Sequence, residues 1–346
     1  MDLAIKNQNI NGVQLSLCIA TMNRAEFLGK TLDSILPQLE PNVEIIILDG
    51  ASTDNTSGLV ASYAAKYENI RYLREDKASG VDIDFDKAVM GARGCYCWLL
   101  GDDDLLKPGS ISRVLDACGQ GHDLVIVDAE VRSADLTELL TRKRLKMRDD
   151  SVYLPEDSDR LMKDTGIHLT FIGAVIIRRA LWLRRNRQKY YGTEFVHVGV
   201  IFQAPIHGTT LVVPEPLISI RYGNAHWSER AFEIWMFKWP QLIWSFDSIS
   251  QDARLSISPL EPWRNIRNLL LYRAFGSYNS RAFRRLVRPK VKALEMIAPW
   301  VVSVLPGVFV NLTVIIFFRL LKPHLKGVLI DLFSSPFWIG NLVRRR

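Results

Sequence analysis

Hydrophobic and polar positions follow two alternating periods along the first third of the chain. Short apolar runs, each of the length of a β-strand, cover residues 15–20, 43–48, 70–73, 95–100 and 123–127. Between them, apolar residues recur at helical spacing, which predicts helices over residues 27–36, 59–67, 85–92 and 111–118. Strands that alternate with helices predict an α/β fold with a mostly parallel sheet, flanking helices, and ligands at the carboxyl ends of the strands.

The pattern changes in the second half of the chain. Residues 171–177 have strand character, and residues 211–213 with 217–221 resemble a hairpin. Residues 297–318 are uncharged and long enough to span a bilayer, but Pro299 and Pro306 interrupt them. We expect helices that lie in or dip into a membrane, with a single span and a buried pair of core helices as the alternatives.

Charge is divided unevenly along the 346 residues, whose net charge is +7. Residues 253–346 hold 16 Lys and Arg against 3 Asp and Glu (+13), which leaves 28 against 34 (−6) in residues 1–252. A basic and apolar tail indicates an anionic membrane surface as partner, and not nucleic acid. We therefore predict a catalytic domain over residues 1–232 and a helical, membrane-associating region over residues 233–346.

Cysteine usage and the amino-terminal residues bear on location. Four dispersed cysteines without zinc-site spacing favour a reducing compartment. Residues 1–14 are polar, so we expect no secretory signal peptide. Together with the basic tail, these features predict a protein at the cytoplasmic face of the inner membrane, peripheral or monotopic.

The most informative polar feature is a run of three carboxylates, Asp102, Asp103 and Asp104, directly behind the apolar residues 95–100. Carboxylates at the end of a buried strand need a cation, and a divalent metal that bridges phosphate oxygens is the usual one. The run therefore predicts a metal and nucleotide site at the carboxyl edge of the sheet. A solvated turn is the alternative.

Three motifs in order resemble the family 2 glycosyltransferases, which have the GT-A fold. They are residues 17–24 (LCIATMNR), residues 47–56 (ILDGASTDNT) and residues 101–104 (GDDD), and the resemblance covers residues 14–230. The acidic segment 80–87 (GVDIDFDK) narrows the resemblance to bacterial O-antigen side-branch transferases of the abequosyltransferase type. The chain departs from the family at Gly101, where an acidic residue is usual, and at Met22, where an aromatic one is common.

The resemblance implies roles for the residues of these motifs. Asp49 would accept a hydrogen bond from the nucleotide base, Thr21 would line the same pocket, and Asp102 would face the ribose. Asp103, with Asp104 beside it, would hold Mg²⁺ or Mn²⁺. The other predicted contacts with the nucleotide and the donor sugar are Asn23, Arg24, Asp82, Arg221, Trp227 and Arg230.

An inverting transfer also needs a base, which we expect downstream of the metal site. Glu194 and His197 are three residues apart, so on a helix they would share a face. Either is a candidate, and another group such as Asp128 is a third. For His197 the alternative is a core histidine that is hydrogen-bonded to a backbone carbonyl.

Taken together, the resemblance implies a metal-dependent, inverting transferase that moves one sugar from a nucleotide-diphosphate sugar to a lipid-linked oligosaccharide. The process would be bacterial O-antigen or surface polysaccharide synthesis. The Gln-x-x-Arg-Trp motif of processive relatives is absent, which favours a single addition. The alternatives are a catalytically silent membrane scaffold with the same fold, and a sugar nucleotidyltransferase, although residues 20–24 lack the glycine-rich basic loop of that class.

Overall fold

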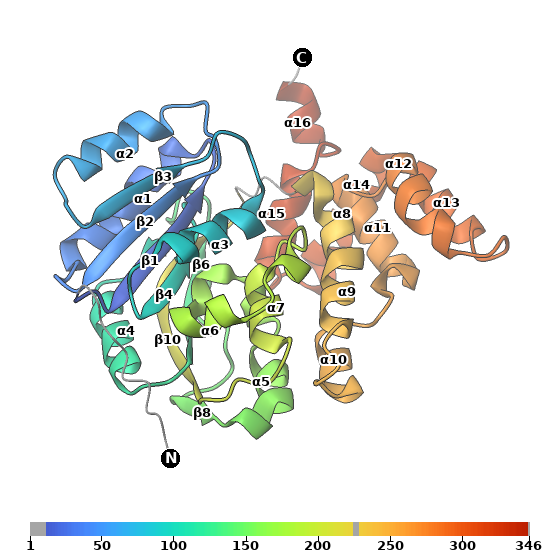
Figure 1. The fold of residues 1–346 in the computed structure, drawn as a ribbon. Coiled ribbons are helices and arrows are strands. Elements are labelled where there is room, and N and C mark those ends of the chain that lie inside the picture. Colours follow the sequence, from blue (N-terminus) through green and yellow to red (C-terminus); the bar gives the residue numbers. More distant parts are fainter. Residues whose placement is uncertain (1–11, 224–227, 345–346) are drawn as a thin grey trace. The chain divides into compact units, whose positions relative to one another are not determined.

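The computed structural model describes residues 12–223 and 228–344, which form two compact units (Figure 1). The first unit comprises Met1–Val131, Thr141–Arg221 and Phe246–Ile257. The second unit comprises Arg132–Leu140, Tyr222–Ser245 and Ser258–Arg346. The expected roles of residues 1–232 and 233–346 stay a prediction.

A mixed sheet forms the centre of the first unit. Its strands follow the order β3-β2-β1-β4-β9-β6-β10-β5, and β8 pairs with β10. The strands are β1 Leu15–Thr21, β2 Val43–Asp49, β3 Ile70–Arg74, β4 Tyr96–Leu100, β5 Leu105–Leu106, β6 Leu124–Arg132, β8 Ser151–Tyr153, β9 Val175–Arg178 and β10 Thr210–Arg221. A further short strand, β7, covers Leu139–Thr141.

The expectation of a mostly parallel sheet is right for one half of it. β3, β2, β1 and β4 run parallel to one another, whereas β9 is antiparallel to both β4 and β6, and β10 is antiparallel to β5 and β8. The expected hairpin over residues 211–221 is wrong, because β10 is one continuous strand. Pro214 and Pro216, which lack an amide N–H, lie between the residues that pair with β8 and those that pair with β5.

Helices cover both faces of the parallel half. Alternate side chains of β1, β2 and β4 form one buried cluster with α1 (Ala25–Ile35), α2 (Thr56–Ala64) and α4 (Ser110–Gly119). On the opposite face, α3 (Val81–Gly91) contacts β1, β2 and α6 (Arg179–Arg184). The first unit also contains α5 (Ser158–Thr165), α7 (Val196–Phe202) and α10 (Gln251–Ile257). Burial on both faces explains why these strands are apolar throughout.

The second unit is mainly helical within its described residues, although its segment Arg132–Leu140 includes the start of β7. Its helices are α8 Ala231–Glu233, α9 Trp239–Trp244, α11 Ile266–Phe275, α12 Ser280–Ala282, α13 Ile297–Val304, α14 Gly307–Leu321, α15 Lys326–Ser334 and α16 Ile339–Arg344. One buried cluster centres on Phe232 and Tyr278, and a second joins α11, α14 and α15 through Ala274, Val310 and Leu332.

The uncharged segment 297–318 forms two helices instead of one. α13 and α14 meet at 97°, and together they have the length and composition of a broken span or a re-entrant loop. Among the described residues, no single helix is both long and apolar enough to cross a membrane. Pro306 lies at the bend, where its ring disfavours helical geometry for the preceding residue.

Candidate active site at the carboxyl edge of the sheet

The register of the parallel strands brings the predicted polar residues to one edge. Thr21, the last residue of β1, pairs with Asp49, the last residue of β2. β4 is parallel to β1 on its other side and ends at Leu100, so Asp102 follows at the same edge. Because the strands are parallel, three separate motifs meet here.

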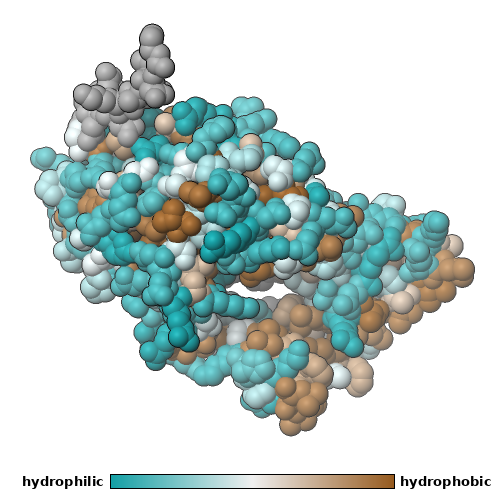
Figure 2. Space-filling model, turned by 90° about the horizontal axis from the view of Figure 1, so that it is seen from below, coloured by the Kyte–Doolittle hydropathy of each residue, from teal (hydrophilic) through white to brown (hydrophobic). Residues whose placement is uncertain are grey.

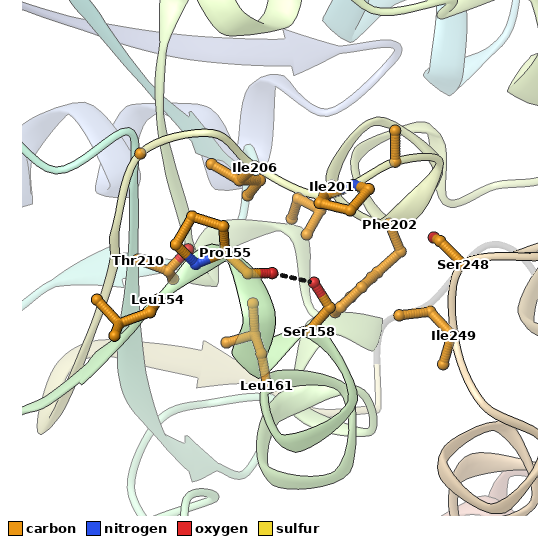
Figure 3. Close-up of a pocket in the computed structure, with 13 residues that line it drawn as sticks. Leu154, Pro155, Ser158, Leu161, Ile201, Phe202, Ile206, Thr210, Ser248 and Ile249 are labelled. Atoms are coloured by element: carbon orange, nitrogen blue, oxygen red, sulfur yellow. Dashed lines mark hydrogen bonds between the residues drawn. The ribbon is translucent and has the colours of Figure 1, made fainter.

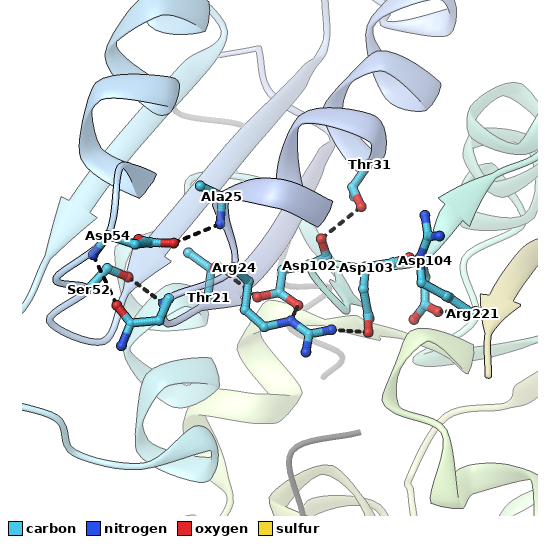
Figure 4. A network of polar contacts seen from close by, with 11 residues as sticks. Thr21, Arg24, Ala25, Thr31, Ser52, Asp54, Asp102, Asp103, Asp104 and Arg221 are labelled. Carbon is cyan, nitrogen blue, oxygen red and sulfur yellow. Dashed lines mark hydrogen bonds and ion pairs between the residues drawn. The ribbon is translucent and has the colours of Figure 1, made fainter. Parts of the chain in front are cut away.

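Asp102 is the centre of a hydrogen-bond network (Figure 4). Its carboxylate accepts from Thr21 Oγ1 at 2.7 Å and from Arg24 Nε at 3.1 Å. Thr31 Oγ1 donates to the Asp102 carbonyl at 2.9 Å. Burial raises the pKa of Asp102 to about 6, although the Arg24 charge acts in the opposite direction.

Arg24 also pairs with Asp103 through Nη2, so one guanidinium holds two carboxylates. Arg24 is itself buried, and its guanidinium carbon lies 4.6 Å from the centre of the Phe27 ring. Arg221, at the end of β10, packs on the same ring at 5.2 Å and donates from Nε to the Asp103 carbonyl. Phe27 thus supports two arginines beside the carboxylates.

Asp104 is hydrogen-bonded to the backbone at the end of β10. Its buried carboxylate accepts from the backbone N–H of Arg221 at 3.2 Å, and burial, with the Asp103 charge next to it, raises its pKa well above the ordinary value. A Cβ at residue 101 would lie 2.7 Å from Asp104 Oδ2. This close approach explains why Gly101 stands where the family usually has an acidic residue.

The three carboxylates differ in how far a metal ion could reach them. Within the part of the chain that the structure describes, no group of three or more His, Cys, Asp and Glu side chains is arranged to hold a metal. Asp102 and Asp104 are buried, whereas the Asp103 side chain is 20% exposed. Asp103 therefore fits a Mg²⁺ or Mn²⁺ ion that takes most of its oxygen ligands from a bound diphosphate and water.

Asp49 is fully buried, and its carboxylate is held from three sides. It accepts from the backbone N–H of Ser52 at 2.7 Å and from Tyr72 Oη at 2.5 Å, and Arg74 Nε lies at 3.6 Å. Burial and the bond to Asp49 raise the pKa of Tyr72 to about 12. Sequence reasoning missed Tyr72 and Arg74, although their spacing on β3 places both on one face at the strand's carboxyl end.

Asn23 connects the loops that follow β1 and β2. Its Oδ1 accepts from the backbone N–H groups of Thr53 (2.7 Å) and Asp54 (3.2 Å), and its own N–H donates to Ser52 Oγ. Its φ of 57° is in the left-handed region, which asparagine tolerates better than most residues. Met22, at the position of the expected aromatic, has an exposed side chain.

The first turn of α3 connects this edge with the segment that contains Glu194. Asp84 approaches the loop after β2, since a Cβ on Gly50 would lie 2.8 Å from its Oδ2. Asp82, on the same turn, accepts from the backbone N–H groups of Glu194 (2.8 Å) and Val196 (2.9 Å). Burial raises the pKa of Asp82 to about 6. Asp82 thus fixes the backbone of Glu194, whose φ is 74°.

Two of the remaining predicted residues, His197 and Asp128, are buried in the first unit. His197 is 1% exposed, its Nε2 donates to the Leu169 carbonyl at 2.7 Å, and burial lowers its pKa to about 4, so its geometry is that of the core histidine weighed above. The buried Asp128 accepts three backbone N–H bonds. Arg230 is exposed in the second unit, and Trp227 lies outside the described residues.

A separate pocket in the first unit contains none of these residues (Figure 3). Its wall has no charged side chain, and the Ser158 hydroxyl in it donates to the Pro155 carbonyl. The wall is formed by Leu154, Pro155, Ser158, Leu161, Ile201, Phe202, Ala204, Pro205, Ile206, Gly208, Thr210, Ser248 and Ile249.

Comparison with known sequences gives the class of protein. Residues 16–184 match the family model described as Glycosyl transferase family 2. The chain is 30% identical over 226 residues to abequosyltransferase RfbV of Salmonella typhimurium, a match that covers 61% of this chain and 67% of that protein. It is 26% identical over 186 residues to a Campylobacter jejuni GalNAc(5)-diNAcBac-PP-undecaprenol beta-1,3-glucosyltransferase, covering 52% and 57%. The chain belongs to glycosyl transferase family 2 and is a glycosyltransferase.

Solved structures agree on the fold. Staphylococcus aureus TarS 1–349 in complex with UDP-GlcNAc aligns with a TM-score of 0.54 at 16% identity, covering 96% of this chain and 92% of that one. The mannosyltransferase PcManGT of Pyrobaculum calidifontis, in complex with GDP-Man and Mn²⁺, aligns with a TM-score of 0.51 at 14% identity, covering 96% and 88%. At these identities the likeness shows the fold alone, and the predicted GT-A fold is confirmed.

Proposed function

We propose that this glycosyltransferase moves a single sugar from a nucleotide-diphosphate sugar to a lipid-linked oligosaccharide in bacterial surface polysaccharide synthesis. The observation that carries the proposal is the group formed by Asp102, Asp103 and Arg24 at the edge where three parallel strands end. A buried acid, an accessible acid and a buried arginine at one sheet edge are suited to a polar ligand that contains both hydroxyls and phosphates.

The nucleotide half of the donor would bind over the ends of β1, β2 and β4. Asp49 and Asp102 offer carboxylate oxygens, the first for the base and the second for the ribose hydroxyls. Both carboxylates are held by partners of their own chain, so they are oriented before the ligand arrives. Arg24 and Arg221, supported on Phe27, supply positive charge for the diphosphate.

Asp103 is the residue that we propose for the divalent cation, in preference to the buried Asp104. When bound, Mg²⁺ or Mn²⁺ would neutralise the negative charge of the departing nucleotide diphosphate. Arg24 pairs with one oxygen of Asp103 in the structure, so Arg24 would compete with a cation for that carboxylate. A guanidinium displaced in this way would be available to the phosphates. The solved relative with GDP-Man and Mn²⁺ supports the choice of ions.

Glu194 is our candidate for the base that takes the proton from the acceptor hydroxyl. It lies two residues before α7, next to the turn of α3 that also approaches the loop after β2. His197 lies in the core and donates its Nε2 proton to a backbone carbonyl, which makes it the weaker candidate. A base that activates the acceptor for direct attack on the sugar gives inversion at the anomeric carbon.

The acceptor is proposed from the relatives. One is named for a substrate linked to PP-undecaprenol, and another for abequosyl transfer. Both names are consistent with one sugar added to a growing saccharide on a lipid carrier.

The test is donor hydrolysis with a panel of UDP-, dTDP-, CDP- and GDP-sugars, with and without Mn²⁺, reading the released nucleotide. We expect metal-dependent release from one donor, and at least a 100-fold loss in Asp103→Asn. Arg113→Met, which removes ion pairs with Asp150 and Glu215 outside the candidate site, serves as the control and should leave the rate unchanged. Near-native turnover by Asp103→Asn contradicts the metal assignment. Silence with every donor, even after addition of membrane lipid extract, favours a catalytically inactive module.

A further inference from the structure

The second unit turns apolar side chains outward along one face of α14. Phe309, Ile316, Phe317, Leu320 and Leu321 are all exposed, with Leu320 at 74%. Their spacing of three, four and seven residues places them along one stripe of the helix. In an ordinary surface helix this stripe is polar and the buried face is apolar.

On α13, too, apolar side chains face outward. Its exposed residues Ile297, Trp300, Val301 and Val304 follow the spacing i, i+3, i+4, i+7, and Trp300 is 52% exposed. Leu294, just before the helix, is 86% exposed. Figure 2 shows brown, hydrophobic side chains on the part of the second unit where Figure 1 places α13.

Neither stripe can turn inward without breaking the core of the unit. The buried Asn311, on the inner face of α14, donates from Nδ2 to the carbonyls of Ala274 and Leu332. On α13, the Pro299 carbonyl accepts from the buried Tyr278 hydroxyl at 2.9 Å. These buried bonds orient both helices, so the exposed apolar faces are a property of the folded unit.

Basic residues flank the two stripes. Residues 288–326 contain six Lys and Arg but a single acidic residue, Glu295, which pairs with Arg264. The exposed Arg288, Lys290 and Lys292 precede α13, and Arg319 and Lys322 lie at the end of α14. Positive charge beside an apolar stripe is complementary to a layer of anionic headgroups over acyl chains.

We propose that the outward faces of α13 and α14 form a lipid-binding surface, which inserts into the headgroup region of an anionic bilayer. We define this surface by Ile297, Trp300, Val301, Val304, Phe309, Ile316, Phe317, Leu320 and Leu321. The occupant is a lipid surface because charge complementarity favours it. A second copy would bring the same basic residues against each other, and like charges across an interface oppose association. The inference does not depend on the proposed donor or acceptor.

The experiment measures sedimentation of the full chain with vesicles of phosphatidylglycerol and phosphatidylcholine, and with vesicles of phosphatidylcholine alone, in the absence of sugar donor. One variant carries Ile316→Ser and Leu320→Ser, and another carries Ile297→Ser and Trp300→Ser. The control carries Ile167→Ser and Leu255→Ser, two exposed residues of the first unit. Circular dichroism and melting curves of each variant show whether it is folded.

We expect the wild type to bind the anionic vesicles, and each lipid-surface variant to bind them about tenfold or more weakly, because each loses two inserted apolar side chains. The control should bind as the wild type does. The proposal is overturned if the wild type does not sediment with anionic vesicles, or if the lipid-surface variants bind unchanged. It is also overturned if lipid-free wild type is a dimer that these variants convert to monomers. Donor hydrolysis by the lipid-free enzyme tests the proposed function separately.

Discussion

Removal of the Arg24 guanidinium tests the central feature of the site. In Arg24→Met, Asp102 and Asp103 lose the cation that holds both of them. Loss of one partner of a fully buried ion pair costs about 3–5 kcal/mol of unfolding free energy. The Asp103 side chain is 20% exposed, so water screens part of its charge, and we expect a loss of roughly 2–3 kcal/mol.

Thermal unfolding in a chelating buffer at neutral pH measures this effect. For a unit of this size, a loss of roughly 2–3 kcal/mol corresponds to a fall in Tm of about 5–10 °C. Mn²⁺ should restore part of the lost stability of Arg24→Met, because a ligand at about 100 times its Kd stabilises the folded state by about 2.7 kcal/mol. The wild type should gain less from Mn²⁺, since Arg24 competes for Asp103.

Two matched variants make the result specific. Arg24→Lys keeps the charge but not the forked pair of donors, so we expect an intermediate Tm. Arg113→Met removes two partly exposed ion pairs, with Asp150 and Glu215, and should leave the Tm within about 1 °C of the wild type. The reasoning is refuted if Arg24→Met has the same Tm as the wild type, or if Mn²⁺ raises the Tm of both proteins equally.

Two further variants test the acid and base assignments. Glu194→Gln should lower the acceptor-dependent rate by about 10²–10⁴-fold at saturating donor. His197→Asn should lower the Tm and leave that rate within about tenfold of the wild-type rate. The reverse result assigns the base to His197. Burial raises the pKa of Asp82 to about 6, so the folded state binds the proton more tightly than the unfolded state does. As the pH falls from 7 to 4, the free energy of unfolding of the wild type should therefore rise by roughly 2–3 kcal/mol relative to that of Asp82→Asn, as measured by denaturant titration. A difference between the two proteins that does not change with pH contradicts this assignment.

The parallel half of the sheet could be predicted because its signals are local. Each buried strand is an apolar run, and α1 and α4 each bury a mainly apolar face, so periodicity locates them. The antiparallel half could not be predicted in the same way. β9 inserts between β4 and β6, and β10 pairs with β5 and β8 at its two ends. These pairings join distant segments, and no local pattern encodes them.

The candidate site likewise has residues that the sequence predicts and residues that it does not. Thr21, Asp49 and Asp102 were predictable because they end or follow parallel strands, and parallel strands share a carboxyl edge. The residues that hold them in place were not predicted. Tyr72 reaches Asp49 from the neighbouring strand, and Thr31 reaches the Asp102 carbonyl from a helix. Such partners depend on strand register and helix packing, which the sequence does not display at those positions.

The role of Asp82 in the folded protein differs from the role that its sequence position predicts. The sequence predicts Asp82 as a contact with the nucleotide or the donor sugar. In the structure its two carboxylate oxygens accept from backbone N–H groups of Glu194 and Val196, more than a hundred residues later. These two hydrogen bonds fix the backbone from which the Glu194 side chain extends. Asp82 therefore acts through Glu194, as a positioning residue for the proposed base.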